Sequence, residues 1–140
     1  MYKNILLPYD FGNSFSNVPE QLKKLAGDDP DHMITIFNII PEGELANSVR
    51  YAGKHFETLA GGKKEQLKPF TEQLDELGLN YQLEFASGLI TQTLLRQINE
   101  NDYDVVVMSN KRSRRDIKHV LGHVTHKVAK RVNTPVLIVK

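Results

Sequence analysis

The chain contains no cysteine, which excludes disulfide bonds, thiolate catalysis and cysteine-ligated zinc sites. Its formal net charge is only +1, so no overall field draws it to nucleic acid or membrane, and any basic patch must be local. Long apolar runs are also missing near its start, where Ile5 to Leu7 are too few for a signal-peptide core or a membrane span. We therefore expect a cytoplasmic protein that does not enter membranes.

The residues that are present predict one α/β domain. The chain has 140 residues, of which 40% are hydrophobic and 25% charged, as in a single globular domain covering residues 1–140. Five segments rich in β-branched, aromatic and aliphatic residues predict strands, and continuous apolar runs in three of them favour a parallel sheet covered on both faces. These segments are 2–8, 33–40, 80–85, 104–109 and 135–140.

Helices are predicted between the strands, where apolar residues recur at intervals of three and four. The helical segments are 18–26, 65–77, 90–98 and 124–132. Ser16 is the expected cap of the first helix, and Gly78 is the expected stop of the second.

Alternating strands and helices imply right-handed crossovers and a doubly wound, five-stranded parallel sheet with helices on both faces. The stretch 42–64 is the least regular part, because three glycines interrupt its helical pattern. These are Gly53, Gly61 and Gly62. We expect irregular surface there, with a mobile flap as the alternative.

Ligands of such sheets bind beyond the carboxyl ends of the strands, where the direction of the crossovers changes. Here the loops after the first and fourth strands meet that condition. In the first loop, the Asp10 carboxylate can accept hydrogen bonds from a ribose or an adenine amine, or can close an Asx turn, while Gly12 allows a sharp turn. The second loop closes at Gly122, before a helix whose free amides favour an anion.

Three stretches, "KNILLPYDFGNS", "DYDVVVMSN" and "HVLGHVTHKVAKRVNTPVLIVK", resemble universal stress proteins of the UspA type, and the resemblance covers essentially the whole chain. It implies a Rossmann-like fold of the kind found in adenine nucleotide alpha hydrolases. In one branch of the family, a loop patterned G-x2-G-x9-G-(S/T) binds ATP or a related nucleotide. The matching positions here are Ser109, Arg112, Gly122 and His123, so only the third keeps its glycine. The implied adenosine contacts are Pro8, Tyr9, Asp10, Ile39, Met108 and Val124.

Basic residues crowd the segment 111–131, in which Asp116 is the only acidic residue. They are Lys111, Arg112, Arg114, Arg115, Lys118, Lys127, Lys130 and Arg131. A positive φ at Arg112 would cost about 1 kcal/mol, which disfavours a glycine-style phosphate cradle. Guanidinium groups can instead hold a phosphate of ATP or AMP, so two interpretations stay open: side chains have replaced the cradle, or the loop has lost binding.

Neither a metal site nor a catalytic site is predicted. His119, His123 and His126 have helical spacing, but Gly122 is expected to interrupt the helix and no cysteine or carboxylate cluster completes a ligand set. His123 near a helix N-terminus should charge only when an anion is bound. Three serines lie near the expected cleft without a histidine or acid at a catalytic spacing. They are Ser14, Ser16 and Ser109.

The last strand is expected at a sheet edge, and the resemblance implies a homodimer formed by its antiparallel pairing with a second copy. Its apolar residues are Val136, Leu137, Ile138 and Val139. The alternative is an edge covered by the protein's own helices.

Taken with the loop analysis and the absence of a catalytic pattern, this predicts a non-enzymatic stress-response dimer with a degenerate nucleotide-binding loop. One alternative is an ATP- or AMP-binding switch or slow ATP hydrolase. The other is a polyanion or nucleic-acid binder that uses 111–131. The lack of aromatic residues in that segment disfavours the second alternative.

Overall fold

The computed structural model describes residues 2–41, 43, 56–109, 111–112 and 120–140. In chain order, its elements are β1 (Asn4–Pro8), β2 (Asn13–Ser14), α1 (Val18–Ala26), β3 (Met33–Pro41), α3 (Phe56–Glu76), β4 (Tyr81–Gly88), α4 (Ile90–Glu100), β5 (Val105–Ser109), β6 (Lys111–Arg112), α5 (Val120–Arg131) and β7 (Val136–Val139).

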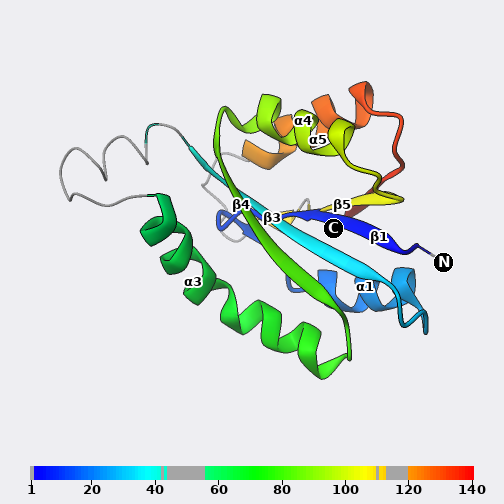
Figure 1. Cartoon of the computed structure of the whole chain (residues 1–140). Helices are drawn as coiled ribbons and strands as arrows, with labels where there is room; N and C mark the ends of the chain where they lie inside the picture. The colour runs from blue at the N-terminus through cyan, green and yellow to red at the C-terminus, as the bar shows by residue number, and fades with distance from the viewer. Residues whose placement is uncertain (1, 42, 44–55, 110, 113–119) are drawn as a thin grey trace.

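A five-stranded sheet in the order β4-β3-β1-β5-β7 forms the centre of the structure, and all its neighbouring strands run parallel (Figure 1). Successive crossovers lead from β1 outward to β3 and β4, and then return to place β5 and β7 on the other side of β1. The predicted doubly wound fold is therefore confirmed. The change of direction lies between β1 and β5.

Helices cover both faces of the sheet, with α1 and α3 on one side and α4 and α5 on the other (Figure 1). The predicted apolar stripes are buried, as Leu22 in α1 and Leu94 in α4 show. Gly78 has a φ of 70° directly after α3, as expected of a helix stop. The predicted Ser16 cap is wrong: the N-cap of α1 is Asn17, which forms no side-chain capping bond.

The helix α3 is longer than predicted. Gly61 and Gly62 lie inside it, so the expected irregular surface is wrong for 56–64. A β-carbon added to either glycine would have nothing within 4 Å. The other residues of 42–64, apart from Gly43, lie outside the described residues. Each glycine costs a helix about 1 kcal/mol, but the buried stripe further along α3 outweighs that penalty. Its residues are Leu67, Phe70, Thr71 and Leu74.

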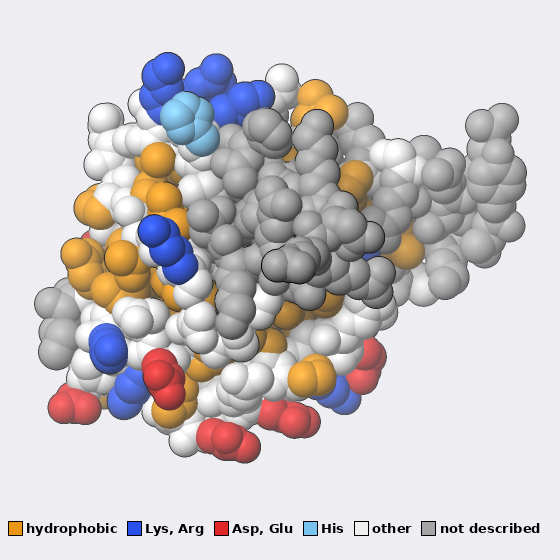
Figure 2. All heavy atoms as spheres, turned by 180° about the vertical axis from the view of Figure 1, so that it is seen from behind, with side chains coloured by type: hydrophobic (Ala, Val, Ile, Leu, Met, Phe, Trp, Pro, Cys, Tyr) orange, Lys and Arg blue, Asp and Glu red, His pale blue; other side chains and the backbone are white. Residues whose placement is uncertain are grey.

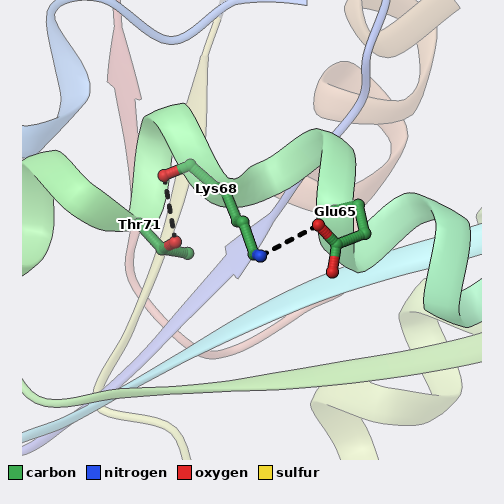
Figure 3. A network of polar contacts seen from close by, with 3 residues as sticks. All are labelled: Glu65, Lys68 and Thr71. Carbon is green, nitrogen blue, oxygen red and sulfur yellow. Dashed lines mark hydrogen bonds and ion pairs between the residues drawn. The ribbon is translucent and has the colours of Figure 1, made fainter.

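Polar contacts support α3 around its internal Pro69, which cannot donate a main-chain hydrogen bond. The Lys68 ammonium lies 2.9 Å from a carboxylate oxygen of Glu65, one turn earlier (Figure 3). The Thr71 hydroxyl donates to the Lys68 carbonyl at 3.2 Å. The Glu65–Lys68 pair is exposed, so it contributes little stability, and burial of the apolar stripe is the main reason that α3 forms. Within the described part of the chain, no helix has both the length and the apolar character needed to cross a membrane.

Candidate functional site

The carboxyl ends of β1 and β5 lie side by side at the point where the crossovers change direction. The register pairs Leu6 with Val106, so Pro8 and Met108, two residues further along, are level and point to the same face. Both are buried, and Met108 is fully so. Ile39 lies on this face too, two residues beyond the Phe37 that pairs with Pro8. The structure thus brings together three of the predicted apolar contacts, and Val124 is buried on α5, which covers this face (Figure 1).

Tyr9 continues β1 and anchors the loop that follows. Its main-chain nitrogen donates to the Phe37 carbonyl at 2.8 Å. Its ring stacks on Phe15 with centroids 4.2 Å apart, and the rings of Phe11 and Phe70 lie 5.1 and 5.2 Å away. Burial raises the pKa of the Tyr9 hydroxyl, and the nearby Asp10 carboxylate raises it further. The Tyr9 ring is therefore part of a packed aromatic cluster made of Tyr9, Phe11, Phe15 and Phe70.

Asp10 forms the Asx turn that the sequence left open as an alternative. Its Oδ1 accepts a hydrogen bond from the Gly12 amide at 2.8 Å, so the carboxylate is held just beyond the tip of β1. A β-carbon at position 12 would lie 3.3 Å from that oxygen, which is closer than ordinary contact. Gly12 is thus explained by this close approach, since its φ is not among the positive values.

Asn38 is a residue of this site that the sequence reasoning missed. It lies in β3, is only 6% exposed, and its Nδ2 donates to the Tyr9 carbonyl at 2.9 Å. Its Oδ1 is the one buried side-chain polar atom without a hydrogen-bond partner among the residues that the structure describes. The available signal was a single amide inside the apolar run "MITIFNII". Asn38 fixes the peptide that immediately precedes Asp10.

The loop after β5 is attached to the loop after β1. Ser109 is 1% exposed, and its hydroxyl donates to the Ser14 carbonyl at 2.5 Å. Next to this bond, β2 and β6 pair antiparallel, with Asn13 opposite Arg112 and Ser14 opposite Lys111. We call these four residues, Asn13, Ser14, Lys111 and Arg112, the β2–β6 clasp. The sequence did not predict it.

One condition considered for the phosphate loop does not apply, and one expectation about it is wrong. Arg112 lies in the extended strand β6, and no described non-glycine residue has a positive φ, so the backbone strain considered for Arg112 does not arise. The helix α5 begins at Val120, so Gly122 and His123 lie within its first turns, and Gly122 does not interrupt the helix between His123 and His126. The positions of Arg114, Arg115, Lys118 and His119 lie outside the described residues.

Three basic residues of the segment 111–131 have described side chains, and all three lie on α5. Lys127, Lys130 and Arg131 are exposed near the end of α5, with the exposed His126 beside them. Figure 2 shows Lys and Arg side chains gathered with a histidine at the top of the molecule, where α5 lies. Lys130 is about 15 Å along the helix from Val120, at 1.5 Å per residue. Among the described residues, no group of three or more His, Cys, Asp or Glu side chains could hold a metal ion.

The strand β7 lies at an edge of the sheet, with β5 as its only strand neighbour in the described chain. Ile138 is 42% exposed, whereas Val139 is 7% exposed and belongs to the core. A surface groove of about 580 Å³ runs between β7 and the start of α1. Across it, the Asn17 side-chain amide donates to the Lys140 carbonyl at 2.7 Å. This edge therefore presents apolar side chains beside a groove.

Comparison with known proteins gives consistent matches over the full length. The model of the Universal stress protein family matches residues 1–140. The chain is 22% identical to Universal stress protein MJ0577 of Methanocaldococcus jannaschii, covering 100% of this chain and 96% of that protein. The solved MJ0577 structure has a TM-score of 0.78 at 23% identity, again over 100% and 96% of the two chains.

Two nucleotide complexes have the same fold. One is a universal stress protein from Archaeoglobus fulgidus in complex with dAMP, with a TM-score of 0.64, 15% identity and coverage of 99% and 98%. The other is an Arabidopsis thaliana protein of this family with AMP bound, with a TM-score of 0.63, 17% identity and coverage of 99% and 91%. At these identities, the likeness shows a common fold.

Proposed function

The chain belongs to the universal stress protein family, and from this premise we propose that it binds an adenine nucleotide at the switch point between β1 and β5. The carrying observation is the convergence of Pro8, Ile39 and Met108 on one sheet face, close to the held carboxylate of Asp10. Apolar side chains with one convergent carboxylate suit a flat base joined to a ribose. The dAMP and AMP complexes of two proteins with this fold support the same ligand class.

We further propose that the protein is a cytoplasmic, non-enzymatic stress-response protein. Two serines near the site donate hydrogen bonds to groups that are not bases. The Ser109 hydroxyl donates to a main-chain carbonyl, and the Ser14 hydroxyl donates to that of Ser16 at 3.2 Å. A serine nucleophile needs a base in place of such partners.

Calorimetry on the full chain tests nucleotide binding. We expect heat from titration with AMP, and at least about tenfold weaker binding in Asp10→Ala, because a charge-assisted hydrogen bond is worth about 1.5–3 kcal/mol. Asp28→Ala is the matched control, since Asp28 is exposed in the turn after α1. Absence of heat from AMP, ATP and adenosine at millimolar concentration would exclude the proposed binding.

The homodimer is proposed to form by antiparallel pairing of β7 with its counterpart. The exposed Ile138, on an edge strand with β5 as its only neighbour among the described strands, offers apolar surface to a second strand. Ile138→Asp should yield monomers or insoluble protein in sedimentation velocity. Ser87→Asp, at an exposed position of the opposite edge strand β4, should remain a dimer. Unchanged sedimentation of Ile138→Asp would rule out this interface.

A further inference from the structure

We propose that His32 is an acid-sensitive latch between two connections at the amino ends of the strands. One connection is the loop 27–32, which leads from α1 to β3, and the other is the turn 77–80, which leads from α3 to β4. They follow the two helices that share one face of the sheet (Figure 1). Both lie at the end of the sheet opposite the switch point, so the inference goes beyond the proposed function and does not depend on nucleotide binding.

The His32 ring is held between two main-chain groups and is only 5% exposed. Its Nδ1 lies 2.6 Å from the Asp29 carbonyl oxygen, which can only accept a hydrogen bond, so Nδ1 carries the proton. Its Nε2 accepts a hydrogen bond from the Asn80 main-chain N–H at 2.9 Å. These two partners fix a neutral ring with a bare Nε2.

Asn80 fastens the turn to the same loop by further hydrogen bonds. Its side-chain amide donates to the Pro30 carbonyl at 3.1 Å and to the His32 carbonyl at 3.2 Å. Its own carbonyl accepts from the Ile34 main-chain N–H at 3.0 Å. All of these groups are amides and carbonyls, which do not titrate. The bond to Nε2 is therefore the part of the Asn80 junction that depends on a proton.

Protonation of the ring would turn Nε2 into a second donor. Two donors would then face each other across 2.9 Å, and the buried imidazolium would lack an acceptor at Nε2. The closed latch thus excludes the proton, whereas an open latch exposes the ring and admits it. Because an exposed histidine takes up a proton near about pH 6.5, the latch contributes its full stability above that pH and loses it as the pH falls further.

The charges around the junction favour the protonated ring. The elements that meet there carry more carboxylates than ammonium groups, and within the described part of the chain none of these groups forms an ion pair with the ring. They are Lys23 and Lys24 in α1, Asp28, Asp29 and Asp31 in the loop, Asp75 and Glu76 in α3, Tyr81 in β4, and Lys3 before β1. The net negative charge attracts a proton that the closed geometry cannot accept, and these opposed demands make the junction responsive to acid.

Amide hydrogen exchange followed by NMR on the full chain tests the latch. The protection factor, which corrects for the intrinsic pH dependence of exchange, should fall at the Asn80 amide by about tenfold between about pH 7.5 and 5.5. This is the change expected for one proton that only the open state binds, near about pH 6.5. His32→Gln keeps an acceptor for Asn80 but does not titrate, so it should lose this dependence. His126→Gln, at an exposed position of α5, is the matched control and should retain it.

The nitrogen-15 chemical shifts of the ring give a second measurement, which decides the matter even if His32→Gln does not fold. They should show a bare Nε2 in the closed state at both pH values. A ring that becomes protonated while the Asn80 amide keeps its protection would overturn the inference, because the bond would then not depend on the neutral ring. A tenfold fall that persists in His32→Gln would also overturn it, since the surrounding carboxylates would then be its cause.

Discussion

The two loops that flank the switch point are held in place by different means. The loop after β1 is anchored in the core by the stacked rings of Tyr9 and Phe15 and by the buried amide of Asn38. The described part of the loop after β5 is held by the Ser109 hydroxyl and the β2–β6 clasp. Two paired residues are marginal on their own, whereas a buried aromatic pair is worth several kcal/mol. The first loop therefore offers a preorganised carboxylate, and the second depends on a weak pairing.

Truncation within the aromatic cluster should have the largest effect. Phe15 is 5% exposed and packs on both Tyr9 and Phe70, so Phe15→Ala should lower the free energy of unfolding by about 3–5 kcal/mol. Phe11 is only half-buried, and Phe11→Ala should cost clearly less. Urea unfolding followed by circular dichroism measures both. Equal and small losses would show that the first loop is not anchored in the core.

Removal of the Asn38 amide should have the next largest effect. Asn38→Ala leaves the Tyr9 carbonyl without its side-chain donor, which should cost about 1–3 kcal/mol. The same variant should weaken AMP binding, because the peptide before Asp10 loses its support. Asn99→Ala, at an exposed position of α4, is the control and should be nearly neutral in urea unfolding. Full stability of Asn38→Ala would mean that this hydrogen bond does not position the first loop.

The difference between the two loops also explains which parts could be predicted from the sequence. The strands follow from apolar runs such as Val105 to Met108, and the rule for ligand sites in doubly wound sheets singled out the loops after the first and fourth predicted strands, which are β1 and β5. The Asx turn of Asp10 is a local contact, and it was recognised as an alternative. Partners far apart in sequence were not, because the bond between Asn38 and Tyr9 depends on the register of β1 and β3.

Errors in the prediction have related physical causes. β2 and β6 contain two residues each, which is too short for any periodic pattern, and they form only because the sheet brings two loops together. Gly61 and Gly62 were interpreted as helix breakers because propensity is visible locally. The burial of Leu67 and Leu74 that stabilises α3 is a tertiary effect.

The Ser109 hydroxyl tests the weaker loop. Ser109→Ala removes its bond to the Ser14 carbonyl and should cost about 1 kcal/mol of unfolding free energy. The main effect should be local: the amides of Lys111 and Arg112 should exchange with solvent faster while those of β1 are unchanged. Ser87→Ala, at an exposed position of β4, is the control for loss of a hydroxyl. Unchanged exchange at the clasp would mean that β6 is held by something other than this bond.

Tyr9 gives the smallest expected effect, visible only at alkaline pH. Burial, with the charge of Asp10, raises its pKa above the ordinary value of 10.0, so the folded state retains the Tyr9 proton after the unfolded chain has lost it. This contribution to stability is fully present below pH 10 and is lost as the pH rises through the folded pKa. The unfolding free energy should therefore fall between about pH 9 and 11. It should fall more steeply for the unchanged chain than for Asp10→Ala, because that variant lacks the Asp10 charge that adds to the raised pKa of Tyr9. Tyr9→Phe should remove the Tyr9 part of the pH dependence and leave only that of other tyrosines with a raised pKa, such as Tyr103. If Tyr9→Phe has the same pH dependence as the unchanged chain while Tyr103→Phe does not, the Tyr9 hydroxyl is not held in the aromatic cluster, and the first loop is less firmly anchored than the comparison requires.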